Sequence, residues 1–190
     1  MITPLTAANQ QSQKRLNSDY YVEGFATTFD TPYLMYEVVI DRHALDEADL
    51  SDVIFQYNHA GMVYARNKMA KNKPPSLLLE AQESGFFVAA DLGLTTDAKR
   101  IFEGIDSGLI HKMSWAFVVA PGGDSYDAAT HTRRIFKIKK VYDVSAVSFP
   151  ANDDTDITAR SFFDGVIEKE KRETLARKAK ILALKLNLEV

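Results

Sequence analysis

Apolar residues recur in short runs through residues 20–147, and most of these runs are rich in β-branched and aromatic side chains. Runs of this kind, separated by turn-forming residues, are typical of β-strands. The pattern predicts seven strands, at 20–29, 35–41, 53–57, 77–82, 86–92, 110–120 and 134–147. Glu83-Ser84-Gly85 predicts a hairpin between two of them, and Pro121-Gly122-Gly123-Asp124 predicts a polar loop.

Two segments between the strands have a helical pattern instead. The first lies near residues 43–50. The second follows Thr95, which is suited to cap a helix, and it carries Ile101 and Ile105 on one face before it stops at Gly108. Many short strands with only two helices predict a mainly β protein with flanking helices (α+β), and favour a closed or nearly closed antiparallel β-barrel over a doubly wound sheet.

The C-terminal part of the chain differs from the rest in pattern and in charge. Residues 166–190 lack Gly and Pro, and are net basic although the whole chain has a net charge of −3. Their apolar residues recur at helical spacing, which predicts one basic amphipathic helix. This helix docks on a partner or on the body of the protein, or alternatively binds an anionic surface. We expect a flexible segment at 1–18, a barrel domain at 19–158, and a linker with the helix at 159–190.

Composition excludes several kinds of function. The net charge of −3 gives no electrostatic argument for nucleic-acid binding. The absence of Cys excludes disulfides, zinc-thiolate sites and cysteine nucleophiles. No apolar stretch is typical of a secretory signal or a membrane span, so an intracellular soluble protein is expected. No glycine-rich phosphate-binding motif is present, and no cofactor is expected.

His59 is the first candidate for chemistry among the four histidines. It follows the apolar run at 53–57, so its side chain is expected at the end of a strand, held rigidly and able to reach a cleft. The alternative is a structural histidine. The acidic residues around His43 predict either a solvated helix or a divalent-cation site, and a metal-dependent hydrolase that uses His59 with this cluster is a further alternative.

Ser114 and Asp143 are the other two candidates. Ser114 is a small polar residue in an apolar strand, where alternation places Met113 and Trp115 on the opposite face. The small-residue face accommodates a substrate or makes a tight sheet contact. Asp143 also lies in an apolar strand, where burial of a carboxylate requires a partner such as a histidine, a nearby lysine or a backbone donor.

Three blocks in this order resemble the tailed-phage prohead maturation proteases. They are Asn58-His59, Met113-Ser114-Trp115-Ala116-Phe117, and Tyr142-Asp143-Val144-Ser145, the last followed by Phe149-Pro150-Ala151-Asn152. The resemblance covers residues 24–158. It implies a fold similar to that of the herpesvirus assemblin proteases and a serine endopeptidase that acts inside the assembling prohead, in the host cytoplasm. The implied substrates are the scaffolding protein, the scaffolding segment of the major capsid protein, and the protease itself.

The resemblance also implies roles for individual residues. Ser114 matches the nucleophile, His59 the general base, and Asp143 the acidic position that completes a triad, although relatives often have Glu there. For the oxyanion or substrate it suggests Trp115, Arg133 and Arg134, or backbone N–H groups. The sequence departs from the family pattern at Lys112, Trp115 and Ala116, which affects the expected shape of the pocket.

A second class of function fits the same fold. A capsid-assembly or scaffold-binding module could keep the barrel without catalysing a reaction. A homo-oligomer is a further expectation. Three side chains of the required types are present, but they are far apart in the sequence, and only the fold can bring them together.

Overall fold

The computed structural model describes residues 6–7, 16–32 and 38–148. The chain divides into two compact units, Met1–Thr155 and Asp156–Val190, and every described residue belongs to the first. The predicted C-terminal linker and helix at 159–190 therefore lie outside the described residues, as does most of the predicted N-terminal segment. Within the described part, no helix has the length and apolar character needed to cross a membrane.

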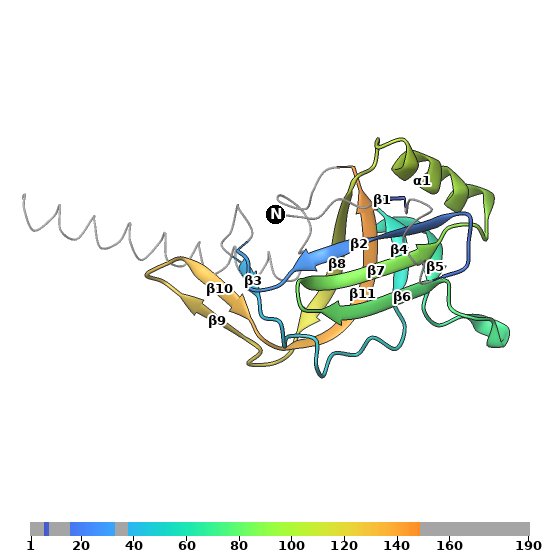
Figure 1. Ribbon diagram of the computed structural model, residues 1–190. Helices are drawn as coiled ribbons and strands as arrows, with labels where there is room; N and C mark the ends of the chain where they lie inside the picture. Colours follow the sequence, from blue (N-terminus) through green and yellow to red (C-terminus); the bar gives the residue numbers. More distant parts are fainter. Residues whose placement is uncertain (1–5, 8–15, 33–37, 149–190) are drawn as a thin grey trace, which may run out of the picture. The chain divides into compact units, whose positions relative to one another are not determined.

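Nearly half of the described residues lie in strands, which form three sheets (Figure 1). The first sheet has the order β1-β2-β7-β6, formed by Thr6–Ala7, Tyr21–Thr28, Gly85–Asp91 and Leu77–Gln82. The second has the order β3-β10-β9, formed by Val38–Ile40, Thr132–Ile135 and Asp124–Asp127. The third has the order β5-β4-β11-β8, formed by Ala60–Arg66, Ile54–Tyr57, Ile138–Val147 and Lys112–Val119. A short 3-10 helix, η1 (Ala70–Asn72), and one α-helix, α1 (Thr96–Asp106), complete the described elements.

The mainly β class with a helix is confirmed, but the described residues form no closed barrel. Their strands lie in three separate sheets. Two pairings, β11 with β4 and β10 with β3, are parallel, whereas the sequence predicts antiparallel pairing throughout. Runs of apolar residues indicate where strands lie but not which strands pair, because pairing depends on contacts between distant parts of the chain.

The predicted strand at 134–147 is in fact two strands in different sheets. The break lies at Phe136 and Lys137, whose backbone N–H groups both donate to the carbonyl oxygen of Gly123, at 2.9 and 3.0 Å. Gly123 is required at this crossing, because a Cβ there would lie 2.3 Å from the Lys137 carbonyl oxygen. The chain therefore leaves β10 and enters β11, the strand that carries Asp143.

The two predicted helices have opposite outcomes. α1 is confirmed, with the Thr95 hydroxyl accepting from Ala98 N at 3.1 Å and Gly108 in the left-handed region just after the helix. The helix predicted near residues 43–50 is wrong, because turns occupy residues 43–47 and Asp49 forms an isolated β-bridge with Lys140. Side chains of aspartates there accept from nearby backbone N–H groups, as Asp41 does from His43 N at 3.0 Å, and such bonds compete with helix formation.

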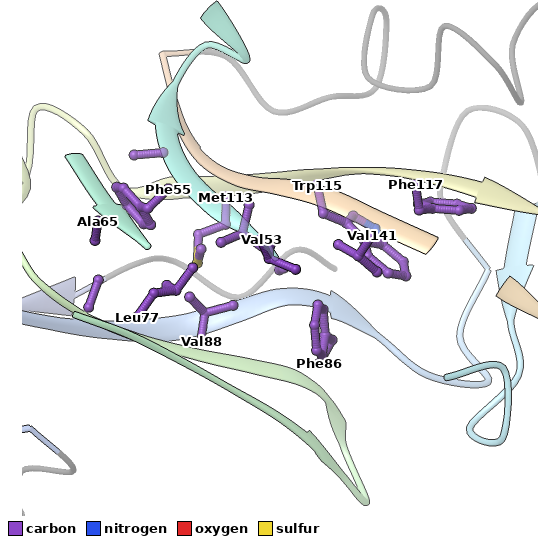
Figure 2. Close-up of a cluster of buried hydrophobic side chains, with 14 of the residues drawn as sticks. Val53, Phe55, Ala65, Leu77, Phe86, Val88, Met113, Trp115, Phe117 and Val141 are labelled. Carbon is purple, nitrogen blue, oxygen red and sulfur yellow. The ribbon is translucent and has the colours of Figure 1, made fainter. Parts of the chain in front are cut away.

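The core lies between the third sheet and the first (Figure 2). Met113 and Trp115 of β8 pack there with Phe55 of β4, opposite Phe86 and Val88 of β7. The ring centroids of Phe86 and Trp115 are 5.4 Å apart. Because side chains alternate along a strand, the intervening residues of β8 and β11 lie on the other face of the third sheet. That face carries the candidate site.

Candidate active site

Ser114 lies near the beginning of β8, on the face away from the core. Its cross-strand neighbour on β11 is Ser145, and the next pair on this face is Ala116 with Asp143. Directly paired residues place their side chains on the same side of a sheet, so these four small or polar residues share one face. The alternation predicted from the sequence for Ser114 and its apolar neighbours is confirmed by the burial of Met113 and Trp115 in the core.

A β-bulge lies just before Asp143 on β11. Val141 pairs with Phe117 and Asp143 pairs with Ala116, so two steps on β11 correspond to one step on β8. The extra residue is Tyr142, which is exposed. Residues two apart on a regular strand point the same way, but across this irregularity Val141 lies in the core while Asp143 shares the face of Ser145. The bulge therefore lets β11 carry a core residue and the site carboxylate two positions apart.

His59 lies in a two-residue turn between β4 and β5. Tyr57 and Ala60 are paired on either side of it, and Asn58 and His59 have φ angles of 52° and 55°. Positive φ at both central residues is characteristic of a type I′ hairpin turn, in which a histidine is strained relative to glycine. The parallel pairing of β4 with β11 brings the turn to the end of β11, where Asn58 N donates to the Ala146 carbonyl oxygen at 2.9 Å.

The structure brings the three predicted triad side chains into one hydrogen-bonded chain. His59 Nδ1 lies 2.7 Å from Asp143 Oδ1, and His59 Nε2 lies 2.8 Å from Ser114 Oγ. An ionised carboxylate only accepts hydrogen bonds, so the Nδ1–H group donates to Asp143. The lone pair on Nε2 then accepts from the Ser114 hydroxyl. This tautomer is the one in which an imidazole can remove the serine proton.

The three residues of this hydrogen-bonded chain are largely shielded from solvent. Ser114 and Asp143 are buried, and the His59 side chain is 22% exposed. Hydrogen bonds in such surroundings hold their groups in place more firmly than bonds in water. The arrangement has the chemical elements of a nucleophilic hydrolase: an alcohol, a base in contact with its proton, and an acid in contact with the base.

The structure does not bring the predicted oxyanion residues together with Ser114 in the same way. The Trp115 indole packs in the core, with its ring centroid 4.3 Å from that of Phe117. Arg133 and Arg134 lie on β10, in a different sheet from Ser114. Arg133 Nε donates to Asp124 at 2.8 Å, while Arg134 Nη1 donates to carboxylates at 2.9 and 3.3 Å. Their part in binding the oxyanion or the substrate stays a prediction.

Individual ion pairs neutralise the carboxylates of the acidic segment around His43. Cationic side chains pair with its carboxylates one by one, for example Lys140 with Asp49 and Arg66 with Asp52. Hydrogen bonds from these two cations hold the pKa of Asp49 and that of Asp52 below the usual range. Within 6–7, 16–32 and 38–148, no three His, Asp or Glu side chains converge to hold a metal ion.

The structure places three further polar residues next to the triad. Ser145 Oγ donates to Asp143 Oδ1 at 2.7 Å. Asn58 and Ser148 bond to each other at the turn that carries His59. One signal was available for Ser145, since it stands two residues after Asp143 on a predicted strand and must share its face. No sequence signal pairs Asn58 with Ser148.

The sequence and structure of the chain were compared with those of known proteins and protein families. No curated protein and no solved structure matches the chain. The family model described as Caudovirus prohead serine protease matches residues 7–170, a range that includes His59, Ser114 and Asp143. This match covers most of the chain, so the chain belongs to the Caudovirus prohead serine protease family, whose members are serine proteases of bacteriophage capsid maturation.

Proposed function

We propose that this chain is a serine endopeptidase in which Ser114 is the nucleophile, His59 the general base and Asp143 the acid that orients His59. The observation that carries the proposal is the unbroken contact from Asp143 Oδ1 through both ring nitrogens of His59 to Ser114 Oγ. Membership of the Caudovirus prohead serine protease family supports it independently of the geometry.

The first half of the reaction forms an acyl-enzyme. Ser114 Oγ attacks the carbonyl carbon of the scissile peptide bond while His59 Nε2 takes the hydroxyl proton. The resulting imidazolium is stabilised by the Asp143 carboxylate, which stays ionised. When the tetrahedral intermediate collapses, the C–N bond breaks, and Nε2 gives its proton to the departing amine.

The second half of the reaction restores the enzyme. A water molecule attacks the acyl carbon, and His59 Nε2 takes one of its protons. The C–O bond to Ser114 then breaks, and the serine oxygen regains a proton from Nε2. Both tetrahedral intermediates carry an oxyanion, which needs hydrogen-bond donors. In our proposal, backbone N–H groups, Arg133 or Arg134 supply these donors. The Trp115 ring lies in the core, so only the backbone N–H of Trp115 is proposed as a donor.

Membership of the family supports a capsid or scaffold substrate in general. In our proposal the protease acts inside the assembling prohead, on the scaffolding protein or on the scaffolding segment of the major capsid protein, and it also cleaves itself. We place self-cleavage in residues 153–163, around Thr158-Ala159-Arg160-Ser161, so that the basic segment after it is removed. The relation to the assemblin fold and a homo-oligomeric enzyme belong to the same proposal.

The second candidate function is a capsid-assembly or scaffold-binding module without turnover. A fluorophosphonate probe separates the two, because it forms a covalent bond with an activated serine and not with an ordinary one. We expect an adduct at Ser114, located by mass spectrometry of the digested protein. The Ser114→Ala protein should form none, and its cleavage of scaffold and of itself should fall by about 10⁴-fold or more.

Two controls make this test decisive. Ser107→Ala changes an exposed serine at the end of α1, and it should leave both labelling and cleavage unchanged. Circular dichroism should show that all the variants fold. A Ser114→Ala protein that still cleaves scaffold would disprove the proposed role of Ser114. A folded wild-type protein that neither cleaves nor labels would favour the binding module.

A further inference from the structure

We propose that Ser145 is a fourth member of the site, a positioning residue that fixes the carboxylate of Asp143 so that it can orient His59. This inference rests on the proposed serine protease function. It assigns Ser145 no contact with the substrate. Its role is to act through Asp143 on the base.

The Ser145 side chain is fully buried, and its one described side-chain bond is to the acid. Ser145 is 0% exposed, and its hydroxyl donates to Asp143 Oδ1 at 2.7 Å. A buried hydroxyl needs a partner, and a bond to a charged group is stronger than one to a neutral group. Replacing this serine therefore removes an anchor from the carboxylate rather than a surface contact.

Two donors meet at the same carboxylate oxygen. Asp143 Oδ1 accepts from Ser145 Oγ and from His59 Nδ1, each at 2.7 Å. Rotation of the carboxylate would move Oδ1 away from both donors and break both bonds, so each bond opposes it. The Ser145 bond thus holds the carboxylate in the orientation in which Oδ1 faces the imidazole.

The two serines of the site are cross-strand partners, but their hydroxyls bond to different members of the triad. Ser145 pairs directly with Ser114 across β11 and β8, so both hydroxyls lie on one face. Ser114 contacts His59 Nε2, whereas Ser145 contacts Asp143, two residues before it on the same strand. A nucleophile needs contact with a base, and a carboxylate that already accepts a hydrogen bond from an imidazole N–H is a poor one. This geometry assigns nucleophilic attack to Ser114 and positioning to Ser145.

A double-mutant cycle tests whether Ser145 works through Asp143. Ser145→Ala in the otherwise native protein should lower kcat by about 10- to 100-fold, with little change in KM, because the bond orients the base and does not bind substrate. In an Asp143→Ala background, the same change should alter the remaining rate by less than about twofold, because the group it positions is gone. Equal losses in both backgrounds would overturn the proposal.

Matched variants separate positioning from a simple packing effect. Ser145→Thr keeps the hydroxyl, and Ser145→Val puts a methyl group of similar size in place of the threonine hydroxyl. We therefore expect the Thr variant to retain more activity than the Val variant by about 10-fold or more. This comparison decides the question even if Ser145→Ala fails to fold. Ser76→Ala is the control, because Ser76 is also buried but bonds to the Arg66 backbone. It should leave kcat unchanged.

A spectroscopic measurement follows the same bond without turnover. The proton between His59 Nδ1 and Asp143 should give a far-downfield NMR resonance in the wild-type protein, and Ser145→Ala should shift or broaden it while Ser76→Ala does not. If Thr and Val are equally active and the resonance is unmoved, Ser145 has no positioning role, although Ser114 can still be the nucleophile. If the wild-type protein neither cleaves nor labels, both proposals fail together.

Discussion

Asn58 holds Ser148 through both polar atoms of its side-chain amide. Its Oδ1 accepts from Ser148 N at 3.0 Å, and its Nδ2 donates to Ser148 Oγ at 3.4 Å. The Tyr57 hydroxyl hydrogen-bonds with the same Ser148 hydroxyl. Ser148 directly follows β11, and Asn58 directly precedes His59. The turn that carries the base is therefore attached to the end of the strand that carries the acid.

This attachment predicts a graded effect of substitutions at Asn58. Asn58→Gly keeps a residue that adopts positive φ easily but removes both side-chain bonds, so kcat should fall by about 3- to 10-fold. Asn58→Ala loses the bonds and also strains the turn, so it should lose more activity and some stability. Steady-state cleavage of a peptide substrate measures both.

Ser148→Ala is the matched control for the turn. It removes the hydroxyl but keeps the backbone N–H that bonds to Asn58 Oδ1. We expect a smaller loss than for Asn58→Gly. Wild-type activity in both Asn58 variants would show that the turn keeps its place without the amide.

Asp143→Asn tests the charge of the acid separately from its shape. The amide still accepts a hydrogen bond, but it carries no charge to stabilise the imidazolium that forms in each half of the reaction. We expect kcat to fall by about 10³- to 10⁴-fold in a folded protein. Peptide cleavage with circular dichroism as a folding check measures this.

Asp46→Asn is the control for Asp143→Asn because it makes the same change in another His–Asp pair. His43 Nδ1 and Asp46 Oδ2 are 3.1 Å apart, and both side chains are exposed. This substitution should leave kcat unchanged. Comparable losses from the two substitutions would mean that the effect does not come from the site.

Two carboxylates paired with arginines predict a loss of stability in acid. Hydrogen bonds from Arg66 lower the pKa of Asp52, and hydrogen bonds from Arg42 lower the pKa of Asp30. A carboxyl whose folded pKa is lowered stabilises the protein fully above the unfolded pKa, near pH 4, and less as the pH falls through the folded value. The free energy of unfolding should therefore decrease from about pH 4 toward pH 2.

Asp52→Asn should reduce this dependence on pH. Titration of position 52 is removed, so the free energy of unfolding, measured with urea at several pH values, should fall less steeply below about pH 4. Because these carboxylates are partly exposed, 1 M salt should also weaken the dependence through screening. Identical slopes for the wild type and the variant would contradict the role given to the Arg66 pair.

A substitution at Gly85, which lies outside the site, should strongly destabilise the protein. Gly85 begins β7 opposite Thr28, and a Cβ there would lie 2.2 Å from the Thr27 carbonyl oxygen. The clash is with backbone, so Gly85→Ala should reduce the free energy of unfolding by about 3 kcal/mol. Urea unfolding followed by the fluorescence of Trp115, the one tryptophan of the chain, measures it.

Gly122→Ala provides the comparison. Gly122 has a φ of 67° and no atom within 4 Å of a built Cβ, so an alanine there meets backbone strain but no clash. We expect a smaller loss, about 1 kcal/mol. Equal losses at the two glycines would show that β2 and β7 can separate to accept the side chain.

The sequence by itself determined the local structure and the kinds of residue in the site. Runs of β-branched and aromatic residues predicted most of the strands, and the Thr95 cap with Gly108 predicted α1, because these signals act between residues close in the chain. The resemblance of three short blocks indicated His59, Ser114 and Asp143 as candidates. Alternation along β8 also predicted the face on which Ser114 lies.

Only the tertiary structure decided how these residues meet. The parallel pairing of β4 with β11, the bulge at Tyr142 and the left-handed turn at Asn58 and His59 each depend on contacts between distant segments. Because strand pairing depends on distant contacts, the sequence could not exclude a closed antiparallel barrel, which the described residues do not form. For the same reason it did not indicate the bond between Ser145 and Asp143. Strand partners and register are set by the packing of whole sheets, which no local run of residues specifies.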